Sequence, residues 1–441
     1  MSQFVTTSDI DAVVGGIRRQ QVMDIVRATT FIGVVLLAWI SMRPFTDLSD
    51  MEIGEVGTGN ELPTYVLYAA LAVLTVALAM RENIRGLATL LTPSFLWFIG
   101  WLCFTILLSF DRSTSIRRFS LTICVIAVTA ALPLLAKSQD EILRWMSIAA
   151  LVLLTTCYLG LLLVPDLSIH LASDPLEPGL AGNWRGSFSH KNGAAAIMVM
   201  IVFYAIAFVR AGRWISGFLV IGLATLFLFH AGGKSSMALC LVVLTVTSLT
   251  SVVRSFAGRV FLLLTPLLLL NMIGVGSVMS DSLGAIAKML PLDSSFTGRT
   301  DIWGFALQSL QPKLLTGYGF AAFWGSTAIQ GLPEGKEWAA FASHSHNGYL
   351  DTALGMGLPG LVLLIVALVI KPLRDFQRAE EGGNAGPLAM AFLQVWLFGI
   401  YLSSMESYFL DRADTIWVTL LLAVFGLHYL SRFRATAHSK A

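Results

Sequence analysis

The residues best suited to chemistry lie at His344-Ser345-His346-Asn347, where a long polar segment ends and an apolar stretch begins. Two of the seven histidines in the chain fall within these four residues. Histidine can accept and return a proton near neutral pH, so an imidazole at this place could act as a general base. The alternative is a pair of histidines that only caps a helix at a membrane boundary.

Cationic side chains at other polar stretches could bind an anion. Lys191 and Lys234 each stand where a polar stretch runs into an apolar one. A helix N-terminus presents unpaired N–H groups and a positive dipole end, so a lysine there strengthens its preference for anions. With Arg185 and Arg299 they would form a diphosphate site, if the fold brings them together. Alternatively, each is an isolated cation whose charged end reaches the membrane surface.

Neither a nucleotide site nor a metal site is predicted. Gly232-Gly-Lys-Ser resembles part of a P-loop, but the position that requires the first glycine is Leu228. His344 and His346 have no cluster of carboxylates near them in the sequence, and the four cysteines lack metal-ligand spacing. We therefore expect no metal and no cofactor, with leaving-group charge neutralised by lysine and arginine.

Composition places the chain among polytopic membrane proteins. Hydrophobic residues make up 56% of its 441 residues and charged residues only 13%, which excludes an ordinary soluble globular protein. The sequence predicts an all-α membrane protein with about twelve transmembrane helices. The expected spans are 28–42, 63–80, 94–109, 119–136, 142–164, 193–209, 214–230, 236–253, 259–280, 348–370, 387–404 and 415–430.

Lysine and arginine in the connections predict the orientation. Lysine and arginine outnumber acidic residues on the face of the membrane where the N-terminus lies, and acidic residues outnumber lysine and arginine on the opposite face. By the positive-inside rule both termini are cytoplasmic, and the loops 165–192 and 281–347 face outward. We expect an uncleaved first anchor. The chain divides into spans 1–9 (1–280), the large outer loop (281–347), and spans 10–12 with a cytoplasmic tail (348–441).

The large loop is predicted to contain an amphipathic helix that begins at Arg299 and lies on the outer surface. Gly317-Tyr318-Gly319-Phe320 predicts a tight turn with an exposed aromatic side chain. Aromatic residues of this loop could stack on sugar rings or anchor the loop at the membrane interface. They are Tyr318, Phe320, Trp324 and Trp338.

Several of these stretches together resemble the O-antigen ligase and polymerase superfamily of bacterial envelope glycosyltransferases, especially its exopolysaccharide polymerases. Arg185-Gly-Ser-Phe-Ser-His190-Lys191-Asn192 is similar to a Ser-His-Lys-Asn stretch of that superfamily. The later stretches follow in the family's order and spacing. They are Lys234-Ser-Ser, Thr297-Gly-Arg299 through Trp303, Gly317-Tyr-Gly-Phe320, His344 to Leu350, and Gly357-Leu-Pro-Gly360.

The resemblance implies a metal-independent, inverting transfer of a glycan from undecaprenyl diphosphate to a sugar hydroxyl at the periplasmic face of the inner membrane. It implies His346 as the base and Arg299 as a diphosphate clamp. Lys234 stands where many relatives carry arginine, and lysine cannot make the bidentate contact. We expect further substrate-binding residues within the same stretches, namely Arg185, His190, Lys191, His344, Asn347 and Tyr318.

The implied partners are a lipid-linked oligosaccharide donor and acceptor, membrane lipid, and the flippase and the chain-length or export proteins of the same pathway, without nucleic acid. The sequence favours a polymerase because Arg185 to Asn192 is close to the exopolysaccharide group. A ligase that transfers the glycan to lipid A core is the first alternative. A transporter is the second, but it should show repeated halves and ionisable groups at mid-membrane. The one acid within a predicted span is Asp351, and it lies near the outer end of that span.

Overall fold

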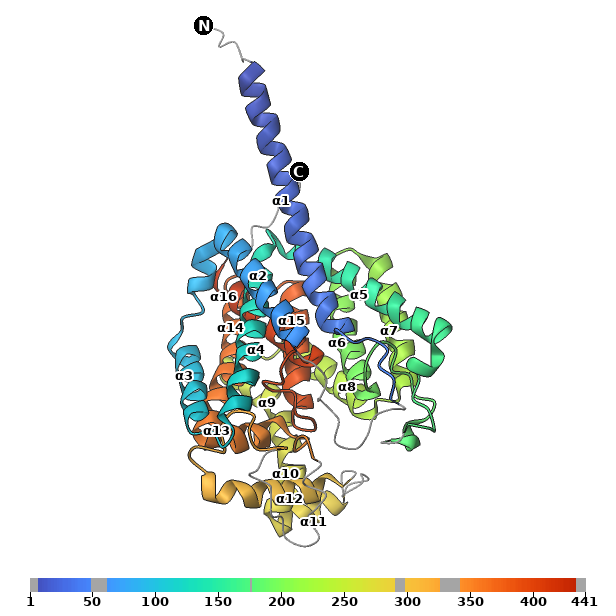
Figure 1. The fold of residues 1–441 in the computed structure, drawn as a ribbon, viewed down its shortest axis with the longest axis vertical. Coiled ribbons are helices and arrows are strands. Elements are labelled where there is room, and N and C mark those ends of the chain that lie inside the picture. Colours follow the sequence, from blue (N-terminus) through green and yellow to red (C-terminus); the bar gives the residue numbers. More distant parts are fainter. Residues whose placement is uncertain (1–6, 49–61, 175–176, 290–297, 326–341, 434–441) are drawn as a thin grey trace.

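The computed structural model describes residues 7–48, 62–174, 177–289, 298–325 and 342–433. The regular elements in these ranges are helices, and the one pairing of extended backbone is an isolated bridge between Ile169 and Trp184. The predicted all-α class is therefore confirmed for the described residues. Figure 1 shows a helical bundle from which α1 (Thr7–Ile40) projects.

Nine helices of the described part are long and apolar enough to cross a membrane, and three shorter apolar helices accompany them. Each of the twelve predicted spans falls on one of these helices, but how many of them cross the membrane stays a prediction. The nine are Ile17–Ile40 of α1, α2 (Leu62–Ala88), α4 with its 3-10 extension (Arg112–Leu135), α5 (Gln139–Leu163), α6 (Lys191–Arg210), α7 (Trp214–Ala231), α9 (Phe256–Ile273), α13 with its continuation (Gly348–Glu381) and α16 (Thr415–Arg432). The shorter three are α3 (Pro93–Leu107), α8 (Lys234–Leu249) and α15 (Pro387–Leu402).

Several predicted span ends differ from the structure; α2, for example, runs to Ala88 rather than to residue 80. The ninth stretch was expected to run to residue 280, but α9 ends at Ile273, because Gly274 leaves the helical conformation and a short α10 (Val275–Met279) follows. The tenth was expected to end at residue 370, but α13 (Gly348–Ile365) continues through a π-helical turn into α14 (Lys371–Glu381). Asp375 of α14, beyond the predicted end of this span, is buried beside His428.

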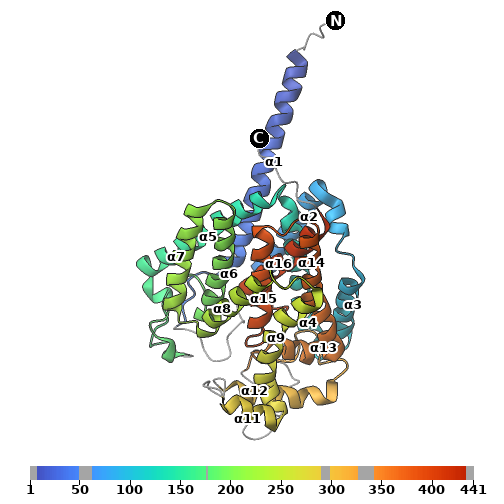
Figure 2. The same cartoon turned by 180° about the vertical axis from the view of Figure 1, so that it is seen from behind.

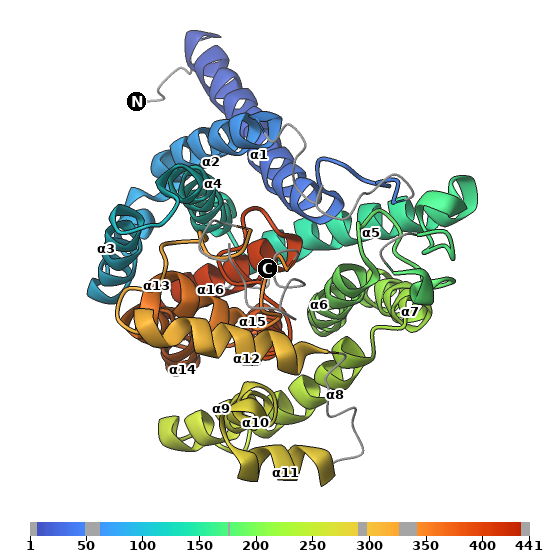
Figure 3. The same ribbon diagram turned by 60° about the horizontal axis from the view of Figure 1, so that its bottom comes forward.

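The centre of the bundle consists of α6, α15 and α16. Their most apolar stretches are largely buried, 78% for α6 and 83% for α16, against 11% for α9. A helix that is apolar on all sides belongs inside such a bundle. In Figure 3, α15 and α16 lie near the middle and α9 lies toward the rim. Phe261 of α9 is 76% exposed, as expected where a helix faces lipid.

The predicted loop helix exists and begins at Arg299. It is α12 (Arg299–Leu310), and Figure 2 shows it with α11 (Asp281–Met289) at the end of the bundle opposite the start of α1. Trp303 and Ala306 of α12 are buried in one apolar cluster with Leu350 and Leu354 of α13. The apolar face of α12 therefore packs on α13 and fixes the loop to the start of that helix.

The predicted turn at Gly317–Phe320 is also present, but its aromatic side chains are less exposed to solvent than expected. Gly317 and Gly319 have positive φ angles, and a Cβ atom at Gly317 would collide with the backbone of α13. Phe320 is only 3% exposed, so its prediction as an exposed aromatic is wrong. Tyr318 is half-buried and its hydroxyl donates to the Ser309 carbonyl at 2.8 Å. Trp338 lies outside the described residues.

Candidate functional site

Asn347 fixes the start of α13. Its Oδ1 accepts hydrogen bonds from the backbone N–H groups of Tyr349 and Leu350, at 3.1 and 2.9 Å. Its Nδ2 donates to Asn271 Oδ1 and to the Ser404 carbonyl. The side chain is fully buried, so the substrate contact predicted for Asn347 would compete with these bonds.

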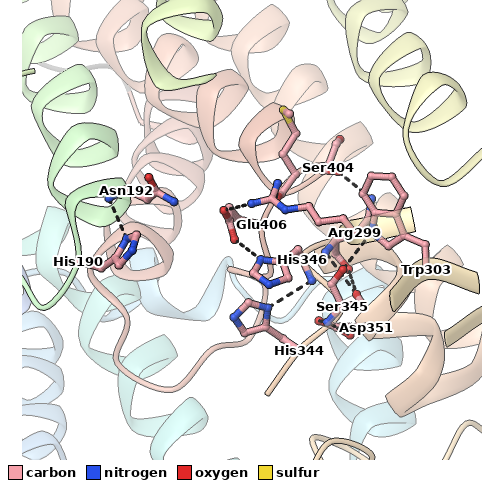
Figure 4. A network of polar contacts seen from close by, with 12 residues as sticks. His190, Asn192, Arg299, Trp303, His344, Ser345, His346, Asp351, Ser404 and Glu406 are labelled. Atoms are coloured by element: carbon pink, nitrogen blue, oxygen red, sulfur yellow. Dashed lines mark hydrogen bonds and ion pairs between the residues drawn. The ribbon is translucent and has the colours of Figure 1, made fainter. Parts of the chain in front are cut away.

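His346 lies beside Glu406, which belongs to the connection between α15 and α16. Its Nδ1 is 2.9 Å from Glu406 Oε2, and Arg299 donates from Nη2 to the other carboxylate oxygen at 2.6 Å. Arg299 also donates from Nη1 to the Met405 carbonyl at 2.6 Å. One carboxylate therefore joins the predicted base to the predicted cation, as Figure 4 shows.

The state of Glu406 determines which nitrogen of His346 carries the proton. Burial acts to raise the pKa of Glu406, but the hydrogen bond from His346 and the charge of Arg299 together hold that pKa below its usual range. The group is therefore a carboxylate at neutral pH and can only accept from Nδ1–H of His346. Nε2 is left with its lone pair, and the ring is one-third exposed, so an acceptor hydroxyl can reach it.

His344 lies against His346 without sharing its carboxylate contact. The two ring centroids are 4.2 Å apart, and His344 Nδ1 accepts the backbone N–H of His346 at 3.3 Å. Burial, followed by the neighbouring His346, lowers the pKa of His344 and favours its neutral form. His344 therefore supports the backbone of His346, while His346 has the geometry of a base.

No cluster of carboxylates lies near these histidines in the sequence, but the fold brings one carboxylate, that of Glu406, to them. Ligand atoms of His344, His346 and Glu406 all lie within 4.8 Å of one another, close enough to hold a metal ion. The fold supplies Glu406 from 60 residues further along the chain. Both carboxylate oxygens are already paired, with Arg299 and with His346, so a metal ion would compete with both contacts. Chemistry without a metal stays a prediction.

Lys191 and Lys234 form a second group. Lys191 Nζ donates to the Gly232 carbonyl at 3.3 Å, two residues before Lys234. A Cβ atom at Gly233 would collide with Ala195, which shows how closely the starts of α8 and α6 pack. The fold thus brings two of the predicted cationic helix starts together. Among the described residues, no hydrogen bond or ion pair joins this group to Arg299 or His346.

His190 caps α6 and pairs with an acid that the sequence analysis did not single out. Its Nδ1 accepts the backbone N–H of Asn192 at 3.1 Å, and Nε2 lies 2.6 Å from Glu177 Oε2. With Nδ1 an acceptor, Nε2 carries the proton that Glu177 accepts. Both nitrogens are used, so His190 has no free lone pair with which to act as a second base.

Arg185 is 1% exposed and holds two loops together. Its guanidinium donates to the Phe188 carbonyl at 3.2 Å and to the Thr46 carbonyl at 2.8 Å. A diphosphate would have to displace these carbonyl oxygens. The predicted contact of Arg185 with substrate stays a prediction, and its observed contacts are structural.

Glu406 was not predicted from the sequence as a partner of the base. An acid directly after an apolar span is the only signal that the sequence offers. Its partners, Arg299 and His346, are 107 and 60 residues away along the chain, so only tertiary packing shows the contact.

A family model and two curated proteins match parts of the chain. A family model described as O-Antigen ligase matches residues 186–365, which include Lys191, Lys234, Arg299 and His346. Residues 186–365 are therefore similar to the O-antigen ligase family. The predicted family resemblance is thereby confirmed for this part of the chain, and Glu406 lies beyond the matched residues.

Two curated proteins are similar to parts of the chain. "Exopolysaccharide production protein ExoQ" of Rhizobium meliloti is 26% identical over 308 residues, which cover 63% of this chain and 64% of that protein. A "Putative polysaccharide ligase" of Rickettsia felis is 27% identical over 144 residues, 31% of this chain and 33% of that protein. The chain thus matches just under two thirds of the first relative and one third of the second.

Proposed function

We propose that this protein is a membrane glycosyltransferase that polymerises undecaprenyl-diphosphate-linked oligosaccharide repeat units into exopolysaccharide. The donor is one lipid-linked chain, and the acceptor is a sugar hydroxyl at the end of a second. The reaction takes place at the periplasmic face of the bacterial inner membrane and needs no metal. The match to the O-antigen ligase family and the similarity to an exopolysaccharide production protein support the class of reaction.

The observation that carries the proposal is the His346–Glu406 pair. Glu406 accepts the Nδ1 proton, so Nε2 of His346 is free to take the proton of the acceptor hydroxyl. The hydroxyl oxygen then forms a bond to the anomeric carbon of the donor, while the bond from that carbon to the diphosphate oxygen breaks. The diphosphate leaves with the electron pair, and attack from the opposite face inverts the anomeric centre.

Cations would stabilise the charge that develops on the departing diphosphate. Arg299 binds the same carboxylate as His346, and its guanidinium carries further N–H groups beyond the two that donate to Glu406 and to the Met405 carbonyl. Lys191 and Lys234 at the starts of α6 and α8 add two further charges and two helix N-termini. A polar centre at one end of an apolar bundle suits a donor whose diphosphate is water-soluble and whose tail is not.

A reconstituted reaction tests the polymerase proposal. Purified full-length protein in lipid vesicles would be given only lipid-linked repeat units, and the products would be sized by electrophoresis. We expect a ladder of longer lipid-linked chains that disappears in His346→Ala. The absence of a ladder, followed by transfer once lipid A core is added, would replace the polymerase with a ligase.

The ligase remains the second candidate because the matching family model is described as O-Antigen ligase and one relative is named a polysaccharide ligase. Donor, base and leaving group are the same in both reactions, so His346, Glu406 and Arg299 serve either. Only the acceptor differs, and the lipid A arm of the experiment decides between them.

A further inference from the structure

We propose that Asp351 is a positioning residue that sets the backbone conformation of His346. Asp351 lies in the first turn of α13, five residues after the base. It accepts the backbone N–H of Ser345, the residue before His346, so its influence on the imidazole passes through the main chain. Because His346 is the base in the function proposed above, the catalytic part of this role depends on that function.

The carboxylate of Asp351 holds the backbone of Ser345. Both of its oxygens accept the Ser345 N–H, each at 3.1 Å, and Oδ1 also accepts Nε1–H of Trp324 at 2.7 Å. On the other side of the same residue, the Ser345 carbonyl accepts Nε1–H of Trp303 at 3.0 Å. Ser345 is fully buried and is therefore held from both directions.

His346 follows this fixed residue in a conformation that side-chain-bearing residues rarely adopt. Its φ angle is +55°, in the left-handed region. Asn347, the next residue, is anchored by its bonds to Asn271 and Ser404. With anchors on either side, the surrounding contacts impose the unfavourable φ angle, as strained residues at functional sites require. In this conformation the His346 ring reaches Glu406 at 2.9 Å.

A carboxylate suits this place better than an amide. The two carboxylate oxygens of Asp351 accept three hydrogen-bond contacts. The Ser345 N–H donates to both oxygens, and Nε1–H of Trp324 donates to Oδ1. In Asp351→Asn one of these acceptor atoms becomes an NH₂ group that opposes an N–H donor. Asp351→Ala removes all three contacts and leaves two donors without this partner. We therefore expect a partial effect for asparagine and a larger one for alanine.

The direct test is the tautomer of His346 in the full-length protein in lipid vesicles. Solid-state NMR of ¹⁵N-histidine-labelled protein distinguishes protonated from unprotonated ring nitrogens, and His346→Ala assigns the signal. Wild type should show a protonated Nδ1 and an unprotonated Nε2. Asp351→Ala should show a mixture of tautomers. Tyr349→Phe, which removes the bond from a neighbouring α13 residue to the Ile400 carbonyl, should keep the wild-type signal.

Turnover supplies the second measurement. Displacing a catalytic group by about 1 Å can cost on the order of 100-fold in rate, so we expect kcat to fall roughly 10- to 100-fold in Asp351→Ala. KM for the lipid-linked donor should change much less, because Asp351 has no proposed contact with it. A general loss of structure would instead lower both kcat and the amount of folded protein, which size-exclusion chromatography and thermal unfolding monitor.

Each outcome bears on the proposal. A wild-type tautomer signal in Asp351→Ala, together with unchanged kcat, would overturn it. If Asp351→Ala does not fold, Asp351→Asn takes its place, and a wild-type spectrum in that variant would overturn it as well. If the wild-type protein transfers no glycan, the proposed function fails, while the NMR comparison still decides whether Asp351 positions His346.

Discussion

Replacing Glu406 with glutamine should reduce turnover more than replacing it with alanine. The carboxylate accepts Nδ1–H of His346 at 2.9 Å and so leaves Nε2 unprotonated. A glutamine amide can instead donate to Nδ1, which places the proton on Nε2, the nitrogen that must accept the hydroxyl proton. Alanine makes no such bond, so the imidazole can still adopt the useful tautomer part of the time.

The magnitude follows from what a general base contributes. Such a base typically accelerates a reaction by about 10²–10⁴-fold, so a fixed wrong tautomer should cost most of that range in Glu406→Gln. A loss of 10³-fold corresponds to about 4 kcal/mol of transition-state stabilisation. In Glu406→Ala we expect roughly a 10- to 100-fold loss, because the ring loses its orientation but keeps its basic nitrogen. Both variants lose the pair with Arg299, so that loss does not separate them.

Steady-state kinetics on purified protein with lipid-linked repeat units would measure kcat and KM for both variants. Asp140→Asn is a matched control, because Asp140 pairs with Arg213 at 2.8 Å near the starts of α5 and α7, away from the His346 group. It should leave kcat within about twofold, since exposed ion pairs contribute little. Wild-type kcat in Glu406→Gln, or a smaller loss with glutamine than with alanine, would refute the tautomer reasoning.

Four further predictions concern the same centre. His346→Ala should abolish glycan transfer while the protein still folds, whereas His344→Ala should reduce transfer less. Single-turnover assays would measure both losses, and a larger loss in His344→Ala would contradict the assignment of His346 as the base. Arg299→Ala should weaken use of the lipid diphosphate donor, and Arg299→Lys should not restore full activity because lysine cannot form two parallel bonds; unchanged donor titrations in both variants would contradict this. Activity should survive excess EDTA, since Arg299 and His346 already occupy both oxygens of Glu406; complete loss that one divalent metal restores would show a metal site at His344, His346 and Glu406. The lowered pKa of Glu406 means that its ion pairs stabilise the fold above the unfolded carboxyl value, about pH 4.3, and that this contribution is lost as the pH falls through the folded value. The difference in Tm between wild type and Glu406→Gln should therefore be largest near neutral pH and shrink in acid, and an increase in acid would contradict the assignment.

Local features of the sequence determined the elements of this protein. Apolar stretches of about 20 residues predicted the helices, because burial of backbone polar groups in lipid leaves few alternatives to the helix. Arg299 was correctly placed at the start of a loop helix, and the glycines at 317 and 319 at a turn. The helices, the start of the loop helix and the turn depend mainly on residues that are close together in the chain, so they can be predicted from the sequence.

Tertiary packing decided how the elements end and what they expose. The helix that begins at Gly348 was expected to end at residue 370, but it continues into α14, where Asp375 packs beside His428 of α16. Phe320 was expected on the surface, but it is buried where its turn packs on α13. A residue's neighbours in space cannot be inferred from its neighbours in sequence.

The candidate site shows the same division. The sequence by itself singled out the pair His344 and His346 and a set of cations that includes Arg299, because such side chains at polar boundaries of an apolar chain suggest chemistry. The family resemblance implied His346 as the base and Arg299 as the diphosphate clamp. Only the tertiary structure decided that Glu406 joins them, that Asp351 holds the peptide before the base, and that Lys191 and Lys234 form a group with each other. The physical reason is that hydrogen bonds and ion pairs act over about 3 Å, whereas these partners lie up to 107 residues apart in the chain.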